Sequence, residues 1–479
     1  MKRYVLETPN DETIAKMLCI AFAASLLLFG FCIETPAAIG RGLRLYMTSR
    51  ATLVSDYFAM ATIGAAFVNA SIVMFLSIGL TLLIKSPYNG PTVAALFLMP
   101  GFALFGKNPI NILPFFYGVY LYSRYQKEPM RKYTAGALYS TTLAPIVSGL
   151  FRIPSLHPSA SFCVAMLAGT AIGFLMIPLA QHLFQMHRGY NLFNFGFASG
   201  IVAYFFTCIA AATGLSIHIQ TFWYSGIDTR VLLFILLLCV GLILLGGFFG
   251  GWRLRRYIQI MRPHGHAPQD LILSDGIGIA MLNMGVVGLI CLAYLFLIGG
   301  DLSGPMLGAI FTAIGFAATG IHPRNIIPVI FGVWIASSPD ITAHATMPVI
   351  QMAALFGATA LAPIASEFGP LMGIVAGMMH FPLVYSSGAF TSGFNLYNNG
   401  FAAGLVAAIM VALLHTLLPR FNITTQRRIM HTLHLRFGRF RHHPHHNDNH
   451  LYGTDSKKTT RGGDQAPDLP SPADLPTDT

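Results

Sequence analysis

The chain has 479 residues, of which 54% are hydrophobic and only 10% are charged, and its mean hydropathy is +0.62. Soluble globular proteins carry about 25% charged residues, so this composition argues against a soluble enzyme, a disordered chain and a nucleic-acid-binding module. The net charge is +11, and much of the excess lies in connectors and in residues 420–441, as the positive-inside bias requires. We therefore expect an all-α polytopic protein of the cell inner or plasma membrane, with the lipid bilayer as its main partner.

Residues 1–12 form a polar leader before the first apolar run, which covers about residues 17–33. Acidic residues such as Asp11 and Glu12 distinguish this leader from the basic start of a signal peptide, so we expect an uncleaved helix. Further apolar runs cover about residues 56–84, 90–106, 109–123, 133–150, 159–183, 190–213, 230–250, 272–298, 304–320, 323–337, 345–366, 369–390 and 393–418. Several reach the roughly 20 residues that span a bilayer. The short pairs 90–106/109–123 and 304–320/323–337 form either tilted spans or re-entrant half-helices.

The apolar segments are duplicated. A shift of 214 residues places 63–123 on 277–337 without a gap, and 22 of these 61 positions are identical. Other offsets match residues 143–146 with 361–364, and 190–200 with 394–404. The sequence therefore predicts two membrane repeats, residues 13–213 and 228–418, each of about seven hydrophobic segments, some of them re-entrant or broken.

An odd number of segments predicts that the second repeat is inverted in the membrane. With the N-terminus inside, the inner connectors hold 14 lysines and arginines, whereas the outer connectors hold six: Arg41, Arg44, Arg50, Lys107, Arg152 and Arg230. This distribution agrees with the positive-inside rule. It predicts residue 128 and the C-terminus in the cytoplasm and residue 220 outside.

Beyond residue 418 the composition changes. Residues 419–450 are basic and histidine-rich, and we interpret them as an amphipathic helix on an anionic leaflet or as a solvated juxtamembrane tail. Residues 451–479 have the composition of a disordered tail. No sequence pattern implies a metal site or a cofactor, and the six cysteines all lie in apolar runs, where we expect them to be core residues.

The run N-L-[FY]-N-x-G-F-A-x-G occurs once in each repeat and is the strongest candidate for a solute site. It supplies Asn191, Asn194, Gly196, Asn395, Asn398 and Gly400. Asparagines three residues apart share one helix face, and an asparagine within lipid needs a polar partner. Because the glycine spacing also lets another backbone approach closely, helix packing is the competing interpretation.

The second candidate is the proline-bounded break at residues 107–114, which recurs at residues 321–328. Proline frees backbone carbonyls, and broken helices in transporters present such groups to solutes. Asn111 and Asn325 follow the break in the two copies, so we predict them as further solute contacts. The competing interpretation is an ordinary turn between helices.

The duplicated Asn-Gly runs, together with the blocks around Gly90-Pro91, Gly101-Phe102-Ala103 and Pro109, resemble a family of bacterial multipass membrane proteins known only as a domain of unknown function. The resemblance covers about residues 13–418 and implies no activity or site residues. The Asn/Gly repeats also resemble inverted-repeat channels for small neutral solutes, such as urea transporters.

We expect the chain to transport a small polar solute at the interface of the two inverted repeats, by alternating access around a site near the membrane midplane. The alternative is a membrane-embedded enzyme or a non-transporting partner subunit. The sequence leaves a homo-oligomer open and gives no sign of a nucleic-acid partner.

Overall fold

The computed structural model describes residues 10–49, 55–151, 153, 155–214, 221–261, 269–342 and 346–417. Most of the predicted leader, and both predicted tail segments, lie outside the described residues. Within these ranges every regular element is a helix, and nine helices are long and apolar enough to cross a membrane. The protein is an all-α polytopic membrane protein, as its composition predicted.

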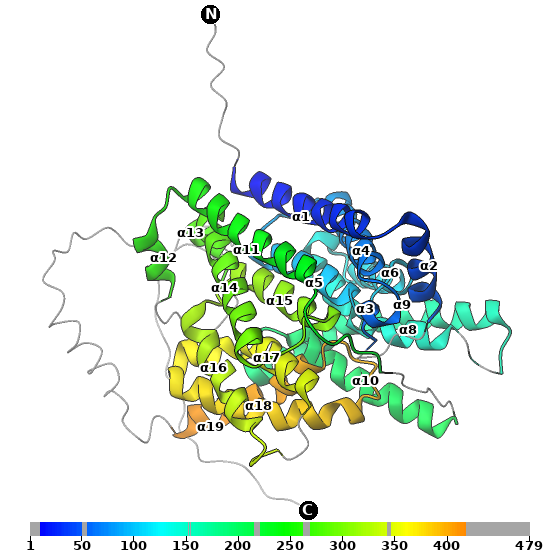
Figure 1. Cartoon of the computed structure of the whole chain (residues 1–479). Coiled ribbons are helices and arrows are strands. Elements are labelled where there is room, and N and C mark those ends of the chain that lie inside the picture. Colours follow the sequence, from blue (N-terminus) through cyan, green and yellow to red (C-terminus); the bar gives the residue numbers. More distant parts are fainter. Residues whose placement is uncertain are drawn as a thin grey trace, which may run out of the picture. The chain divides into compact units, whose positions relative to one another are not determined.

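The helices follow each other in the same order in the two halves of the chain (Figure 1). The first half contains α1 (Asp11–Ile33), α2 (Pro36–Thr48), α3 (Tyr57–Met60), α4 (Ile63–Leu83), α5 (Gly90–Ala103), α6 (Pro109–Tyr125), the 3-10 helix η1 (Met130–Tyr133), α7 (Thr134–Ser140), the 3-10 helix η2 (Thr141–Leu143), α8 (Ala144–Leu150), α9 (Pro158–His187) and α10 (Asn194–Ala212). The second half contains α11 (Thr229–Gly250), α12 (Leu254–Ile260), α13 (Leu271–Asp275), α14 (Ile277–Leu297), α15 (Gly304–Phe316), the 3-10 helix η3 (Ala317–Thr319), α16 (Pro323–Ala336), α17 (Met347–Phe368), α18 (Pro370–Phe390) and α19 (Asn398–Leu417). Helices α11 to α16 correspond to α1 to α6, and α18 and α19 correspond to α9 and α10.

One predicted apolar segment is broken in the structure. Residues 133–150 form the short helices α7, η2 and α8, whereas the equivalent residues of the second half lie in the continuous helix α17. The first copy has three consecutive hydroxyl side chains, and those of Ser140 and Thr141 donate to the carbonyls of Gly136 and Leu138 in the preceding turn. Such bonds compete with helix hydrogen bonds and bend helices. The second copy has alanine at two of these three positions.

Helices α5 and α15 lie side by side and run antiparallel. The Cβ of an alanine at Gly101 would lie 2.9 Å from the Gly308 carbonyl oxygen, and one at Gly315 would lie 3.0 Å from the Ala94 carbonyl oxygen. The shift of 214 residues converts Gly101 into Gly315 and Ala94 into Gly308. The same contact therefore occurs twice, once with each half in each role. The equivalent helices α5 and α15 pack backbone against backbone.

An aspartate from each half accepts a hydrogen bond from the first residue of the short helix, α15 or α5, of the other half. The Asp56 carboxylate accepts a hydrogen bond from the Gly304 backbone N–H at 3.2 Å, and the equivalent Asp270 accepts one from Gly90 at 3.0 Å. Because α5 and α15 are antiparallel, these contacts lie at opposite ends of the pair. Burial raises the pKa of Asp56 to about 6, although the bonds from the backbone N–H groups of Tyr224, Phe58 and Gly304 oppose this shift.

Helices α1 and α11 are also antiparallel. Near the end of α1, the Phe29 ring lies 4.8 Å from the Phe234 ring near the start of α11. At the other end, Asp11 shares a pocket with Phe248 and Gly250, where α11 ends. Figure 1 shows the two helices alongside each other in the described bundle.

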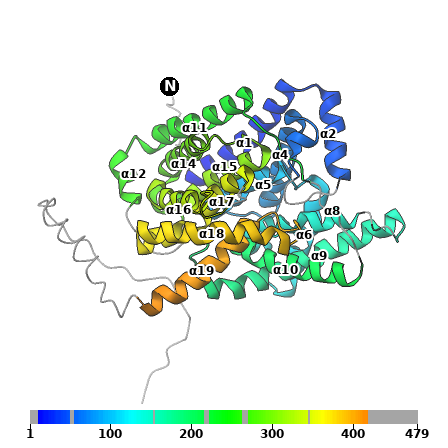
Figure 2. The same cartoon turned by 60° about the horizontal axis from the view of Figure 1, so that its bottom comes forward.

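Each half divides into two groups of helices, with its short helix α5 or α15 between them. Helix α1 packs on α4 and α11 on α14, whereas α6 packs on α9 and α16 on α18. Figure 2 shows the first group above and α9, α10, α18 and α19 below. The core prediction for the cysteines is correct for three of them and wrong for the exposed Cys32, Cys163 and Cys208, which lie on outer faces of α1, α9 and α10.

Candidate functional site

The structure brings the two copies of the Asn-Gly motif together where α10 crosses α19. The Cβ of an alanine at Gly196 would lie 2.8 Å from the Gly400 Cα, so the helices touch through their backbones. The Asn191 Nδ2 donates to the Gly400 carbonyl at 3.3 Å, and the Asn395 Nδ2 donates to the Gly196 carbonyl at 3.4 Å. The first asparagine of each motif therefore hydrogen-bonds the motif of the other half.

The second asparagine of each motif bonds within its own half. The Asn194 side chain bonds His187 Nε2 at 2.9 Å and donates to the Ala180 carbonyl at 2.8 Å, which ties α10 to α9. The Asn398 Nδ2 donates to Ser387 Oγ at 2.8 Å and ties α19 to α18, while its buried Oδ1 has no partner among the described residues. These two side chains connect helices, and they flank the crossing.

Asn111 and Asn325 do not face the crossing. In the first half, the Asn111 Nδ2 donates to the Gly106 carbonyl and to Ser148 Oγ, and its Oδ1 accepts from the Asn108 N–H. Asn325 makes the equivalent bonds to Gly320, Ser366 and His322. Each side chain therefore fastens the start of its helix to the preceding turn, and no described contact joins either one to the motif asparagines.

The hydrogen bonds of the crossing differ between the halves. The Asn395 Oδ1 accepts three bonds, from Thr142 Oγ1 at 3.0 Å, from Ser199 Oγ at 2.8 Å and from the Tyr397 N–H at 3.0 Å. The equivalent Asn191 Oδ1 accepts from the Phe193 N–H at 2.9 Å. The two hydroxyl donors are replaced by alanines at the equivalent positions of the other half, 360 and 403.

A buried lysine extends this asymmetry, and the sequence prediction missed it. Lys107, which was predicted on an outer connector, is 0% exposed in the turn between α5 and α6. Its Nζ donates to the Tyr397 hydroxyl at 2.5 Å and to Met99 Sδ at 3.4 Å, and it lies 4.7 Å from the centre of the Tyr397 ring and 5.4 Å from that of Phe102. We call Lys107, Thr142, Ser199, Asn395 and Tyr397 the central cluster.

The other half has an apolar version of the same arrangement. Ile321 stands at the position equivalent to Lys107, and Phe193 at the position equivalent to Tyr397. The ring contact between Phe102 and Tyr397, at 4.4 Å, has its equivalent between Phe316 and Phe193, at 5.0 Å. The fold is therefore built once with a lysine and a tyrosine and once with apolar residues. This comparison of aligned copies is the signal in the sequence that could have identified Lys107.

A small cavity adjoins the central cluster. Its lining residues are Leu98, Phe102, Phe193, Phe356, Leu396, Tyr397, Asn399 and Gly400, and the centre of a water molecule can occupy about 10 Å³ of it. That is about the space that one water molecule needs. Asn399 Oδ1 pairs with the buried His380 Nε2 at 3.2 Å, where the first half has Phe195 and Met176. The cavity therefore has mainly apolar walls, with a polar group from Tyr397 and another from Asn399.

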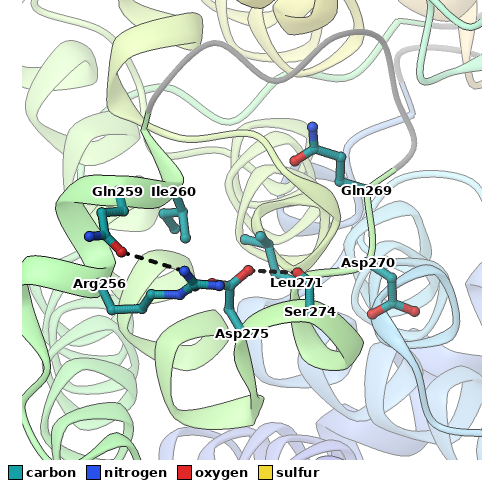
Figure 3. Close-up of a pocket in the computed structure, with 8 residues that line it drawn as sticks. All are labelled: Arg256, Gln259, Ile260, Gln269, Asp270, Leu271, Ser274 and Asp275. Atoms are coloured by element: carbon teal, nitrogen blue, oxygen red, sulfur yellow. Dashed lines mark hydrogen bonds and ion pairs between the residues drawn. The ribbon is translucent and has the colours of Figure 1, made fainter. Parts of the chain in front are cut away.

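A larger pocket of about 640 Å³ opens beside α12 and α13 (Figure 3). Arg256 Nε lies 2.5 Å from Asp275 Oδ1, and Figure 3 shows these side chains reaching toward each other from the two helices. Asp270 also lines this pocket and accepts the Gly90 bond, so the pocket lies at the start of α5. No group of three His, Cys, Asp or Glu side chains among the described residues is arranged to hold a metal ion.

A family described as "protein of unknown function (DUF1576)" matches residues 35–212 and 252–416, which confirms the resemblance found in the sequence. No curated protein and no solved structure matches the chain, so the likeness to urea transporters is not shown.

Proposed function

The chain belongs to the DUF1576 family of proteins of unknown function, and we propose that it is a membrane transporter that moves a small polar solute across the interface of its two halves. The observation that carries this proposal is the central cluster, a set of buried polar side chains where interrupted helices of both halves meet. Polar and ionisable groups buried within a membrane protein are destabilising, and they mark solute or ion pathways. Discontinuous helices of duplicated halves form the substrate sites of many secondary transporters.

We place the two halves in opposite orientations in the cell membrane. The antiparallel packing of α5 with α15, and of α1 with α11, supports this orientation. Lys16 contacts the Tyr88 ring at 5.3 Å, close in sequence to Gly90. Gly90 binds Asp270, which lines a pocket together with Arg256, so the basic residues of α1 and α12 lie at one end of the bundle. The positive-inside rule makes that end cytoplasmic, and the same rule places the C-terminus in the cytoplasm.

Alternating access would open one end of the α5–α15 pair at a time. The two aspartate contacts, Asp56 with Gly304 and Asp270 with Gly90, lie at opposite ends of this pair and each joins the two halves. A rocking motion about the backbone contact of Gly101 with Gly308 would break one of them while it preserves the other. The described conformation has both contacts formed, as expected of an occluded state.

The proposal is tested by solute flux into liposomes that contain the purified full-length protein. We expect one class of small polar solutes to enter faster than into protein-free liposomes. Tyr397→Phe, which removes the hydroxyl acceptor of the Lys107 bond, should slow this flux roughly 10- to 150-fold per folded molecule, since a hydrogen bond to a charged group contributes about 1.5–3 kcal/mol. The exposed Tyr204 offers the matched control, and Tyr204→Phe should leave the flux unchanged. Flux equal to that of protein-free liposomes for every solute would contradict the proposal.

A further inference from the structure

We propose that the solute is a small monocarboxylate and that Lys107 is its counter-ion in the central cluster. This inference rests on the proposed transport function and names the chemical class of its substrate. It follows from three features of the described structure: a buried lysine amine without a carboxylate partner, an apolar equivalent in the other half, and a cavity with mainly apolar walls.

No carboxylate of the described residues would balance the Lys107 amine when it is protonated. Its partners are the Tyr397 hydroxyl, the Met99 sulfur and two aromatic rings, and among the described residues no carboxylate lies within ion-pair distance of its Nζ. An ammonium group away from water is strongly destabilising unless it is paired. Phenol and ring contacts offset part of this penalty, and a bound anion would supply the missing charge.

The fold does not require a lysine at this position. The equivalent Ile321 is buried in the second repeat, and Phe193 stands at the position equivalent to Tyr397. Since the apolar version packs without a charge to neutralise, a purely structural role would favour it at both positions. A lysine retained in only one of two equivalent positions therefore points to a ligand that needs it.

The cavity indicates the rest of the ligand. Five of its eight lining side chains are wholly apolar: Leu98, Phe102, Phe193, Phe356 and Leu396. Both rings that Lys107 contacts, Phe102 and Tyr397, also line the cavity. A short-chain monocarboxylate matches the chemistry of both parts, because its charged end can bind the lysine while its few carbons contact the apolar walls. The cavity must widen to admit it, and we infer that displacement of the Tyr397 ring opens the path to Lys107.

The ligand class is tested by thermal unfolding of the purified full-length protein in detergent at pH 7.5. Acetate, lactate and butyrate are compared with their neutral amides and with sodium chloride at equal ionic strength. We expect at least one carboxylate to raise the unfolding midpoint by binding the folded state, while its amide and chloride do not. Lys107→Met should weaken carboxylate binding roughly 10- to 150-fold, the range for hydrogen bonds to charged groups.

Matched variants separate the charge from packing. Ile321→Met makes an apolar change at the equivalent position and should bind the carboxylate like the unmodified protein. Lys107→Arg retains a cationic side chain and should bind the carboxylate more tightly than Lys107→Met does. Without ligand, Lys107→Met should unfold at a higher temperature, because it replaces a buried polar amine that has no carboxylate partner with an apolar side chain. A lower midpoint, equal stabilisation by the amide or by chloride, or no stabilisation by any carboxylate would each overturn the assignment.

Flux measurements distinguish failure of this inference from failure of the transport proposal. Binding of a carboxylate that depends on Lys107, without any flux of that carboxylate, would preserve the ligand class and contradict transport. Flux of a neutral solute that Lys107→Met leaves unchanged would preserve transport and overturn the carboxylate.

Discussion

Replacing Gly101 with alanine is expected to lower the free energy of unfolding by about 3 kcal/mol, at the upper end of the range for overpacked cores. The added Cβ would lie 2.9 Å from the carbonyl oxygen and 3.0 Å from the Cα of Gly308. These are backbone atoms of a packed helix, so no side chain can rotate away to relieve the contact. Gly315→Ala, at the equivalent position, should have a similar effect, since its Cβ would meet the Ala94 backbone.

The chain offers a matched control for this change. Gly79 is also in a helix, and a Cβ added there meets nothing within 4 Å. Gly79→Ala should therefore change stability by less than about 1 kcal/mol, and in the stabilising direction, because alanine has the higher helix propensity. The measurement is thermal or denaturant unfolding of the three variants in detergent. Equal effects at Gly79 and Gly101 would mean that α5 and α15 do not pack as described.

Asn395→Ala is expected to have the largest effect of the four motif asparagine substitutions. It removes the acceptor that the Thr142 hydroxyl, the Ser199 hydroxyl and the Tyr397 N–H share. Ser199 keeps the Gly196 carbonyl and the Tyr397 N–H keeps Thr142 Oγ1 as a second acceptor, so the Thr142 hydroxyl is the donor left without one. An unmet buried donor costs about 1–3 kcal/mol, so we expect a loss of stability in this range. Solute flux per folded molecule should fall roughly 5- to 150-fold, by the same free energy expressed as affinity.

The substitutions of the other three motif asparagines are expected to have smaller effects on flux than Asn395→Ala. Asn191→Ala removes one acceptor and one weak donor at the crossing, so its effect on flux should be smaller than that of Asn395→Ala. Asn194→Ala and Asn398→Ala remove ties within one half and should lower stability by about 0.6 kcal/mol each, with flux little changed. Normal flux in all four variants, measured beside their stability in detergent, would show that the motif serves only helix packing.

Much of the helical architecture could be predicted from the sequence because it depends on composition and on internal repetition. Apolar runs of about 20 residues gave the long helices, and the shift of 214 residues identified the pairs that the structure describes as equivalent. The meeting of Asn191 with the Gly400 carbonyl, and of Asn395 with the Gly196 carbonyl, also agrees with duplicated motifs at an interface. These features are local or are related by the repeat, so a single sequence contains them.

Other features depend on contacts between distant residues, which the sequence pattern does not contain. Lys107 follows a glycine in a proline-bounded turn, a context typical of exposed connectors, and its burial depends on Tyr397, 290 residues away. The proline breaks indicated helix interruptions correctly. The Asn111 and Asn325 side chains, however, donate to backbone carbonyls of the turns that precede their own helices. The break at residues 133–150 is instead local. It coincides with three consecutive hydroxyl side chains, two of which bond the preceding turn, within an apolar run that otherwise predicts one helix.

The opposite orientation of the two halves is the central claim, and the turns after α4 and α14 test it most directly. Lys85 and Gly299 are equivalent, exposed, and precede the Gly90 and Gly304 contacts at opposite ends of the α5–α15 pair. Single cysteines are placed there after the exposed Cys32, Cys163 and Cys208 are changed to serine, and intact cells are treated with a membrane-impermeant maleimide. The account predicts that Gly299→Cys is labelled in intact cells and that Lys85→Cys is labelled only after lysis. Labelling of both positions from the same side would contradict it.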